Sequence, residues 1–137
     1  MRYFLLALFL MYSGLAQAEE LRVADKAIYD VRIARTTGEL KRGLMFIRKL
    51  PRNQGMLFDV QDYEGVKMWM KDTYIPLDMI FIGCDLKITD IYRNAEPMSM
   101  KMIGSEQPFC YVLEINAGEA DGKDMQIGDA ILIGSSS

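Results

Sequence analysis

Apolar and polar residues alternate in several short stretches of the chain, which is the pattern of strands with one buried face. Between Ile28 and Ala34, the apolar residues Tyr29, Val31 and Ile33 are separated by polar neighbours. Residues 79–83 form a continuous apolar run bounded by turn residues, and a turn at 83–85 joins it to residues 86–92 in a predicted hairpin. The other predicted strands cover residues 21–24, 55–58, 66–70, 110–115 and 130–133.

The same pattern leaves room for two short helices. Thr36 and Glu39 have the spacing of a capping box, so we expect a helix from there to about Leu44. Asn116, followed three residues later by Glu119, predicts a second helix that ends near Gly122. Many short strands, two brief helices and no strand–helix–strand rhythm predict a mainly β (α+β) fold, a single compact curled sheet or partial β-barrel.

The first 18 residues have the order of a secretory signal peptide. Arg2 gives a positive start, residues 3–12 are apolar, and Ala16-Gln17-Ala18 is a small-x-small cleavage site. The alternative is an uncleaved anchor, but the apolar part is shorter than the ~20 residues that span a bilayer as a helix. We therefore expect residues 1–18 to be removed and residues 19–137 to form one periplasmic or secreted domain with no further membrane span.

Composition excludes several kinds of chemistry. The 137 residues contain no histidine, which excludes Ser-His-Asp triads, Cys-His pairs and His-ligated metals. With 16 basic and 19 acidic residues the formal net charge is −3, which argues against nucleic acid as a partner. The two cysteines, Cys84 and Cys110, are separated by 25 residues. In an oxidising compartment they either form a disulfide, worth about 3 kcal/mol by loop entropy, or remain two buried thiols.

Five segments of the chain together resemble the DUF192 family: residues 41–45 (KRGLM), 55–58 (GMLF), 69–81 (WMKDTYIPLDMIF), 111–118 (YVLEINAG) and 127–129 (IGD). They follow the family's order and spacing over nearly all of the chain after the leader. The resemblance implies a compact, β-rich, often exported domain and implies no activity. Asp72 departs from the family pattern, which has Asn after Trp-Met-Lys, and a carboxylate cannot donate hydrogen bonds as an amide does.

The segment from Lys67 to Asp78 contains the main candidate binding residues. On a strand, Met68 and Met70 would face the core while Lys67, Trp69 and Lys71 share the outer face. An aromatic ring beside ammonium groups suits an anionic or sugar-like ligand. The alternative is that Trp69 is structural and covered by residues 51–55.

Charged residues in the same motifs complete the candidate set. Asp78 opens an apolar strand, so we expect it to contact Lys71 across the turn, either as a structural clip or as a ligand-orienting pair. Arg42 suits a carboxylate ligand, and Glu114 is a further acid within a predicted strand.

These residues predict a small, non-catalytic binding or accessory protein, a monomer without a cofactor, whose partner is a small molecule or envelope component. Two alternatives remain. A Cu(I)-binding protein would use Met98, Met100 and Met102, whose sulfurs share one face of a strand, with copper as its cofactor. A hydrolase would use carboxylates such as Glu114 and Asp78 as an acid pair. The predicted ligand-binding residues are Trp69, Lys71, Asp78, Arg42 and Glu114.

Overall fold

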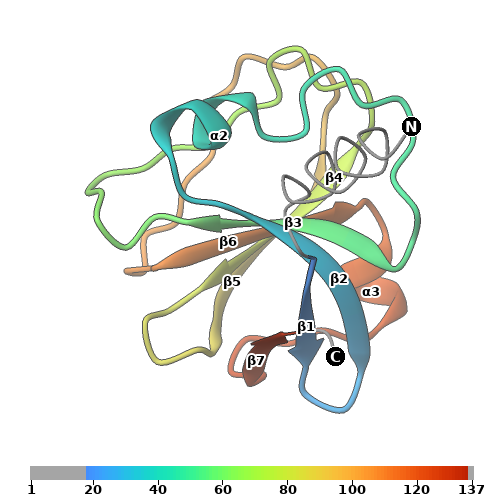
Figure 1. The fold of residues 1–137 in the computed structure, drawn as a ribbon, viewed down its shortest axis with the longest axis vertical. Helices are drawn as coiled ribbons and strands as arrows, with labels where there is room; N and C mark the ends of the chain where they lie inside the picture. The colour runs from blue at the N-terminus through green and yellow to red at the C-terminus, as the bar shows by residue number, and fades with distance from the viewer. Residues whose placement is uncertain (1–17, 136–137) are drawn as a thin grey trace, which may run out of the picture.

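The computed structural model describes residues 18–135, and its main feature is one curled sheet that forms a half-barrel (Figure 1). The predicted mainly β fold with two short helices is therefore confirmed. The leader prediction rests on residues 1–17, which lie outside the described ones, and on Ala18. The strands are β1 (Glu19–Val23), β2 (Ala27–Ala34), β3 (Gln54–Asp59), β4 (Leu77–Ile82), β5 (Ile88–Ala95), β6 (Tyr111–Asn116) and β7 (Ile131–Ser135), and the helices are α2 (Thr37–Arg42) and α3 (Glu119–Gly122).

The strands follow the order β5-β4-β6-β3-β2-β1-β7. Neighbouring strands are antiparallel except β2 and β3, which are parallel and are joined by the crossover that contains α2. The two edges of the sheet meet at one end, where Ile88 N donates to Asp129 O at 3.0 Å and Ile131 N donates to Leu86 O at 2.8 Å. These bonds curl the seven strands toward closure, so the sheet has an inner and an outer face.

Side chains alternate between the two faces along each strand, and both faces are buried over the central strands β3, β4 and β6, whereas alternate residues of β1, β2 and β7 are exposed. The inner face is filled by aliphatic side chains and Tyr29. The outer face is covered by α2 and by the loops that follow α2, β3 and β5, which lie above the sheet in Figure 1. Within β6, Leu113 and Ile115 point inward, whereas Val112 and Glu114 are on the outer face.

The capping box that begins α2 is confirmed, since Thr36 Oγ1 accepts from Glu39 N and the Glu39 carboxylate accepts from Thr36 N. The predicted Asn116 cap of α3 is wrong. Asn116 is the last residue of β6, where strand pairing with Leu77 holds it, and its Nδ2 donates to Leu50 O at 2.8 Å. Gly118 takes the N-cap position with φ +93°, a conformation that glycine adopts at little steric cost.

The predicted strand at residues 66–70 is also wrong. Only Met68 makes a bridge, an antiparallel one with Ile103, and the flanking residues belong to a loop. The predicted alternation nevertheless holds, because Met68 and Met70 are buried while Lys67, Trp69 and Lys71 are exposed. Alternation follows from an extended chain with one buried side and does not require a continuous ladder.

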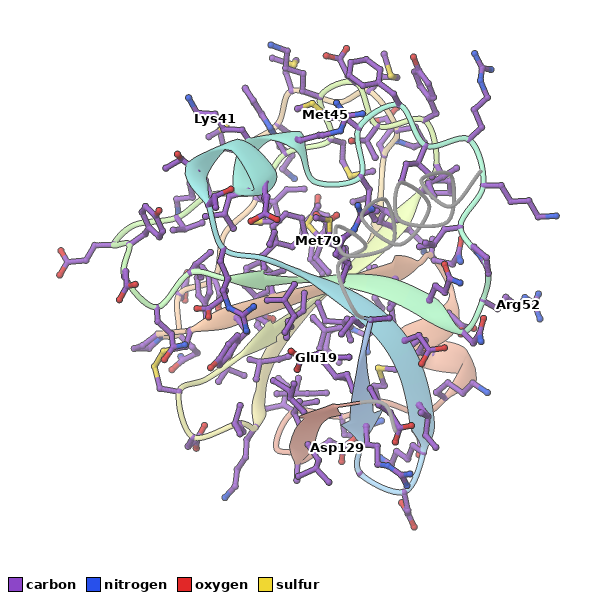
Figure 2. The ribbon with its side chains drawn as sticks, in the orientation of Figure 1. Glu19, Lys41, Met45, Arg52, Met79 and Asp129 are labelled. Atoms are coloured by element: carbon purple, nitrogen blue, oxygen red, sulfur yellow. A yellow bond between two sulfur atoms is a disulfide. The ribbon has the colours of Figure 1, made fainter. Side chains whose placement is uncertain are left out.

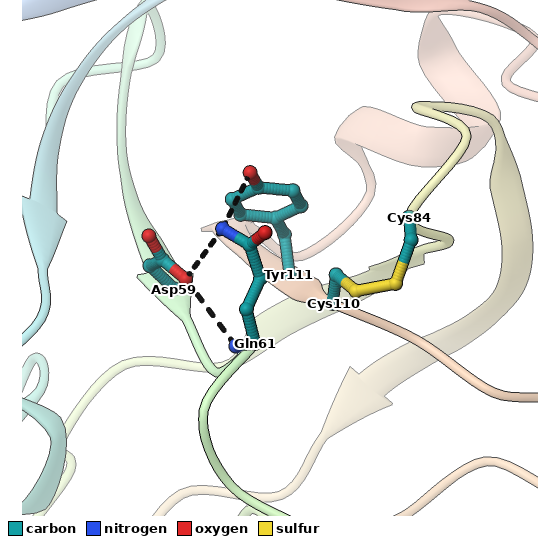
Figure 3. The surroundings of a disulfide bond; sticks show 5 residues. All are labelled: Asp59, Gln61, Cys84, Cys110 and Tyr111. Atoms are coloured by element: carbon teal, nitrogen blue, oxygen red, sulfur yellow. Dashed lines mark hydrogen bonds between the residues drawn. A yellow bond between two sulfur atoms is a disulfide. The ribbon is translucent and has the colours of Figure 1, made fainter.

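A disulfide joins Cys84, in the turn after β4, to Cys110, just before β6, with the two Cα atoms 5.0 Å apart (Figure 3). Of the two open alternatives, the structure therefore has the disulfide. Beside it, Gln61 Nε2 donates to Asp59 Oδ1 at 3.0 Å and to Tyr111 Oη at 2.8 Å. This cluster fixes the chain where β3 ends and β6 begins.

Within residues 18–135, no helix is long and apolar enough to cross a membrane.

Candidate functional site

A hollow of about 320 Å³ lies between the outer face of the sheet and the loop layer above it. We call it the α2 pocket. Phe58 of β3 and Glu114 of β6 reach it from the sheet, and Figure 2 shows Lys41 and Met45 on the opposite, loop side. Its walls are mostly apolar and aromatic, which is typical of small-molecule sites. They include Leu40, Leu44, Val60, Tyr63, Val66, Met68 and Trp69.

Local structure brings the end of α2 close to the sheet. Gly43 caps the helix with φ +46°, and a Cβ at this position would lie 3.1 Å from the ring of Phe58. A larger residue would therefore push α2 away from the floor of the pocket. The glycine lets Lys41 and Arg42, in the last turn of the helix, line the pocket.

Glu114 is the most unusual group of the pocket. It lies on the central strand β6, opposite Met56 on one neighbouring strand and Met79 on the other, and only 4% of its surface is exposed. Within residues 18–135, its carboxyl group makes no hydrogen bond or ion pair, and no fully enclosed side-chain oxygen or nitrogen lacks a partner. The carboxyl group must therefore meet the open space of the pocket.

Burial raises the pKa of Glu114 to about 8, because the charged form loses its hydration. The shift is due to desolvation, and no ion pair with a described residue offsets it. At neutral pH the group is mainly the protonated acid, which can donate a hydrogen bond. Among the described residues that line the pocket, Glu114 is also the only acid.

The cations surround the pocket away from its floor. Lys41, Arg42, Lys67 and Lys71 all line it and are exposed. Trp69, 36% exposed, lies among them with Lys71 Nζ 5.3 Å from the centre of its ring. Trp69 is thus covered only in part and is not sealed by residues 51–55.

Asp78 does not join these residues, and the predicted Lys71–Asp78 contact is wrong. Asp78 is on the inner face of the sheet, where its carboxylate accepts from Asn94 N at 2.9 Å and from Gly118 N and Ala120 N at 3.0 Å each. It therefore caps α3 and clips that helix to the sheet. Because Glu114 is on the outer face, the acid pair of the hydrolase alternative does not form.

The methionine run differs from its predicted strand. Residues 96–102 form a turn and an irregular loop, with Met98 at φ +67°, because the β5 ladder ends at Ala95. The three side chains are more than half exposed, and only Met102 lines the α2 pocket. In the described part of the chain, no cluster of three or more Cys, Asp or Glu is placed to hold a metal ion. Copper binding by the methionines stays a prediction.

Four of the five predicted ligand-binding residues thus line one pocket: Trp69, Lys71, Arg42 and Glu114. The predicted set left out Lys67, although it was placed on the same face as Trp69, and sequence reasoning missed Lys41 and the buried Thr73; all three line the pocket too. One signal for Lys41 was available, because it adjoins Arg42 in the same motif. Chemically, the arrangement offers an apolar cavity, one neutral hydrogen-bond donor at its floor and a ring of cations at its mouth.

Comparisons with known proteins agree with this fold. The family model DUF192, described as Uncharacterized ACR, matches residues 19–133. A crystal structure of a protein of unknown function from Novosphingobium aromaticivorans DSM 12444 is 33% identical, covers 82% of this chain and 83% of that one, and has a TM-score of 0.79. A crystal structure from Sinorhizobium meliloti 1021, described as a candidate transcription regulator, is 36% identical over 88% of this chain and 98% of that one, with a TM-score of 0.81. No curated protein matches the chain.

Proposed function

Because the chain belongs to the DUF192 family, whose description names no activity, we propose from its site alone that it is an exported, non-catalytic protein that binds a small amphipathic organic anion in the α2 pocket. The leader pattern and the disulfide support the exported location, since disulfides persist in oxidising compartments.

The single observation that carries this proposal is the burial of Glu114 at the pocket without a hydrogen-bond or ion-pair partner among the described residues. A largely buried polar group without a protein partner costs free energy, and a bound molecule, an ion or an ordered water usually supplies the missing bond. Glu114 opens onto a preformed cavity, so a ligand that accepts a hydrogen bond from its protonated acid would complete the site.

The sign of the ligand's charge follows from the other residues that line the pocket. Lys41, Arg42, Lys67 and Lys71 attract an anion, and the only acid among the described lining residues is kept neutral by burial. The apolar walls and Trp69 suit a hydrocarbon or aromatic body. We therefore expect a ligand with an anionic group near the mouth and an acceptor oxygen that reaches the floor.

Three probes with the same body and different head groups test this proposal: 3-phenylpropanoate, 3-phenylpropan-1-ol and 3-phenylpropylamine. Trp69 is the only tryptophan, so its fluorescence reports binding without a label. A ligand of the folded state also raises the melting temperature. We expect the acid to bind best, the alcohol more weakly and the amine least.

Variants show whether the probe uses the proposed groups. Replacing Glu114 with Met introduces an apolar side chain of similar size and removes the donor, so we expect about a tenfold loss of affinity for the acid, equivalent to about 1.4 kcal/mol. Glu106→Met, at an exposed position outside the α2 pocket, is the matched control. Failure of all three probes to bind would contradict a binding function, whereas preference for the amine would contradict only the charge of the ligand.

A further inference from the structure

Exposed apolar side chains gather at one end of the molecule. Of the large hydrophobic residues with exposed side chains, six lie on residues 40–49, 66–75 and 97–103. We call the exposed side chains of these three segments the loop surface. Its apolar members are Phe46, Trp69, Tyr74, Met98, Met100 and Met102.

Backbone bonds show that the three segments lie side by side. Phe46 N donates to Asp72 O at 2.9 Å, and the rings of Phe46 and Tyr74 are 6.2 Å apart. On the other side, Met98 N donates to Thr73 O at 3.0 Å. Residues 66–75 therefore run between the other two segments, and all three lie at the top of the ribbon in Figure 1.

Charge is concentrated at the same end. The three segments carry seven of the chain's 16 basic residues, but Asp72 is their only acid among the 19 in the chain. A protein with a formal net charge of −3 thus has one strongly positive surface. The cations lie directly beside the rings: Arg42 is 6.0 Å from the ring centre of Phe46, and Arg48 is 5.4 Å from that of Tyr74.

We infer that the loop surface docks the protein onto an anionic phospholipid bilayer. Aromatic and methionine side chains mixed with cations match the interfacial region of a membrane, where apolar groups enter the acyl boundary and Lys and Arg meet lipid phosphates. Protein interfaces are depleted in lysine, whereas five of the seven cations of this surface are lysines. This composition favours lipid over a protein partner.

Docking would place the mouth of the α2 pocket against the membrane. Lys41, Arg42, Trp69, Lys71 and Met102 belong to both the pocket lining and the loop surface. The inference does not depend on the proposed ligand, because the surface is defined by exposure and charge alone.

Vesicle flotation tests the inference directly. We expect the protein to float with vesicles of phosphatidylcholine containing about 30% phosphatidylglycerol, at least about tenfold more than with phosphatidylcholine alone, and to be released by about 0.5 M NaCl. Emission of Trp69 should shift to shorter wavelength on the anionic vesicles, because its ring leaves water. Equal binding to both kinds of vesicle would overturn the inference.

Two variants and one control locate the contact. Phe46→Ser/Tyr74→Ser/Met100→Ser removes apolar groups, and Lys49→Glu/Lys101→Glu reverses charge without touching the pocket lining. Each should lower binding to anionic vesicles about tenfold. The control, Ile28→Ser/Ile127→Ser/Leu132→Ser, removes apolar groups that are at least as exposed but lie outside the loop surface, and it should bind as the parent does.

All variants share one N-terminus, so any contribution of residues 1–18 is constant among them. Because every substituted side chain is exposed, the circular dichroism spectra should be unchanged. If the control loses as much binding as the two loop-surface variants, or if neither of these loses any, the docking surface is not the one inferred here.

Discussion

Glu114 links the stability of the protein to pH. Burial raises its pKa to about 8 from an ordinary value of 4.5. Between these values the folded protein holds a proton that the unfolded chain releases, so the free energy of unfolding falls as pH rises. The slope for one such group is about 1.4 kcal/mol per pH unit, and it ends above the folded-state pKa. Glu114→Gln cannot ionise, so its unfolding free energy should lack this component of the decline.

Urea unfolding of the parent and of Glu114→Gln, measured at intervals between pH 5 and pH 9, checks this expectation. As pH rises, the unfolding free energy of the parent should fall relative to that of Glu114→Gln. The exposed substitution Glu106→Gln controls for the general effect of removing one acid. Parallel pH profiles for the parent and Glu114→Gln would mean that Glu114 is not held neutral in the folded protein.

Single residues show what the sequence could and could not predict. Trp69, Lys71, Arg42 and Glu114 were found because aromatic, cationic and acidic side chains stood in one set of motifs. Asp78 was misplaced because its partners are backbone N–H groups, which every residue but proline carries and which no motif reveals.

The departure at Asp72 has a backbone explanation. Asp72 has φ +53°, a left-handed conformation that Asn and Asp tolerate better than most residues. Its carbonyl oxygen, and not its side chain, accepts the bond from Phe46 N. The position therefore requires a left-handed turn, which a carboxylate permits as an amide does.

At the scale of elements, α2 depends on its capping box. Thr36 Oγ1 accepts from Glu39 N at 3.1 Å, which satisfies one free donor at the start of the helix. Thr36→Ala removes that acceptor, so we expect the free energy of unfolding to fall by about 1 kcal/mol. Binding of 3-phenylpropanoate should weaken with it, because Lys41 and Arg42 are in the last turn of this short helix.

Thr36→Ser keeps the hydroxyl and serves as the matched variant. Its unfolding free energy, measured with urea, and its affinity for 3-phenylpropanoate, measured by Trp69 fluorescence, should both be close to those of the parent. If the Ala and Ser variants unfold alike, the box does not stabilise α2, and the position of the two cations must depend on other contacts.

Elements with a local cause were predictable, and those set by distant partners were not. The capping box of α2 and the hairpin of β4 and β5 follow from residues close together in the chain. Asn116 had the right spacing for a cap, but pairing of β6 with β4 kept it in a strand. Residues 66–70 had the right alternation for a strand, but their one neighbour meets them only at Met68.

For the whole molecule, the strand order is what creates the site. The sequence places β6 between β5 and β7, whereas the sheet places it between β3 and β4. Only this order puts Glu114 at the centre of the outer face, opposite Met56 and Met79. No local pattern encodes such an order, so the pocket and the burial of its acid could not be predicted.

The disulfide stabilises this whole arrangement through the unfolded chain. Cys84 and Cys110 lie beside each other at neighbouring strands β4 and β6, and Cys110 N also donates to Ile82 O at 2.9 Å. Since hydrogen bonds already join these ends of β4 and β6 in the folded state, the disulfide acts mainly by restricting the unfolded ensemble. The double variant Cys84→Ser/Cys110→Ser should fold, yet lose about 3 kcal/mol of unfolding free energy and show a larger urea m-value.

Urea unfolding of the parent with and without reductant, beside the double serine variant, checks this expectation. The reduced parent should match the variant, because both lack the same cross-link in the unfolded state. Equal midpoints for the oxidised and reduced parent would show that the bond adds nothing. A loss of the expected size would give the protein its full stability only in an oxidising compartment, which is the kind of location that we propose for it.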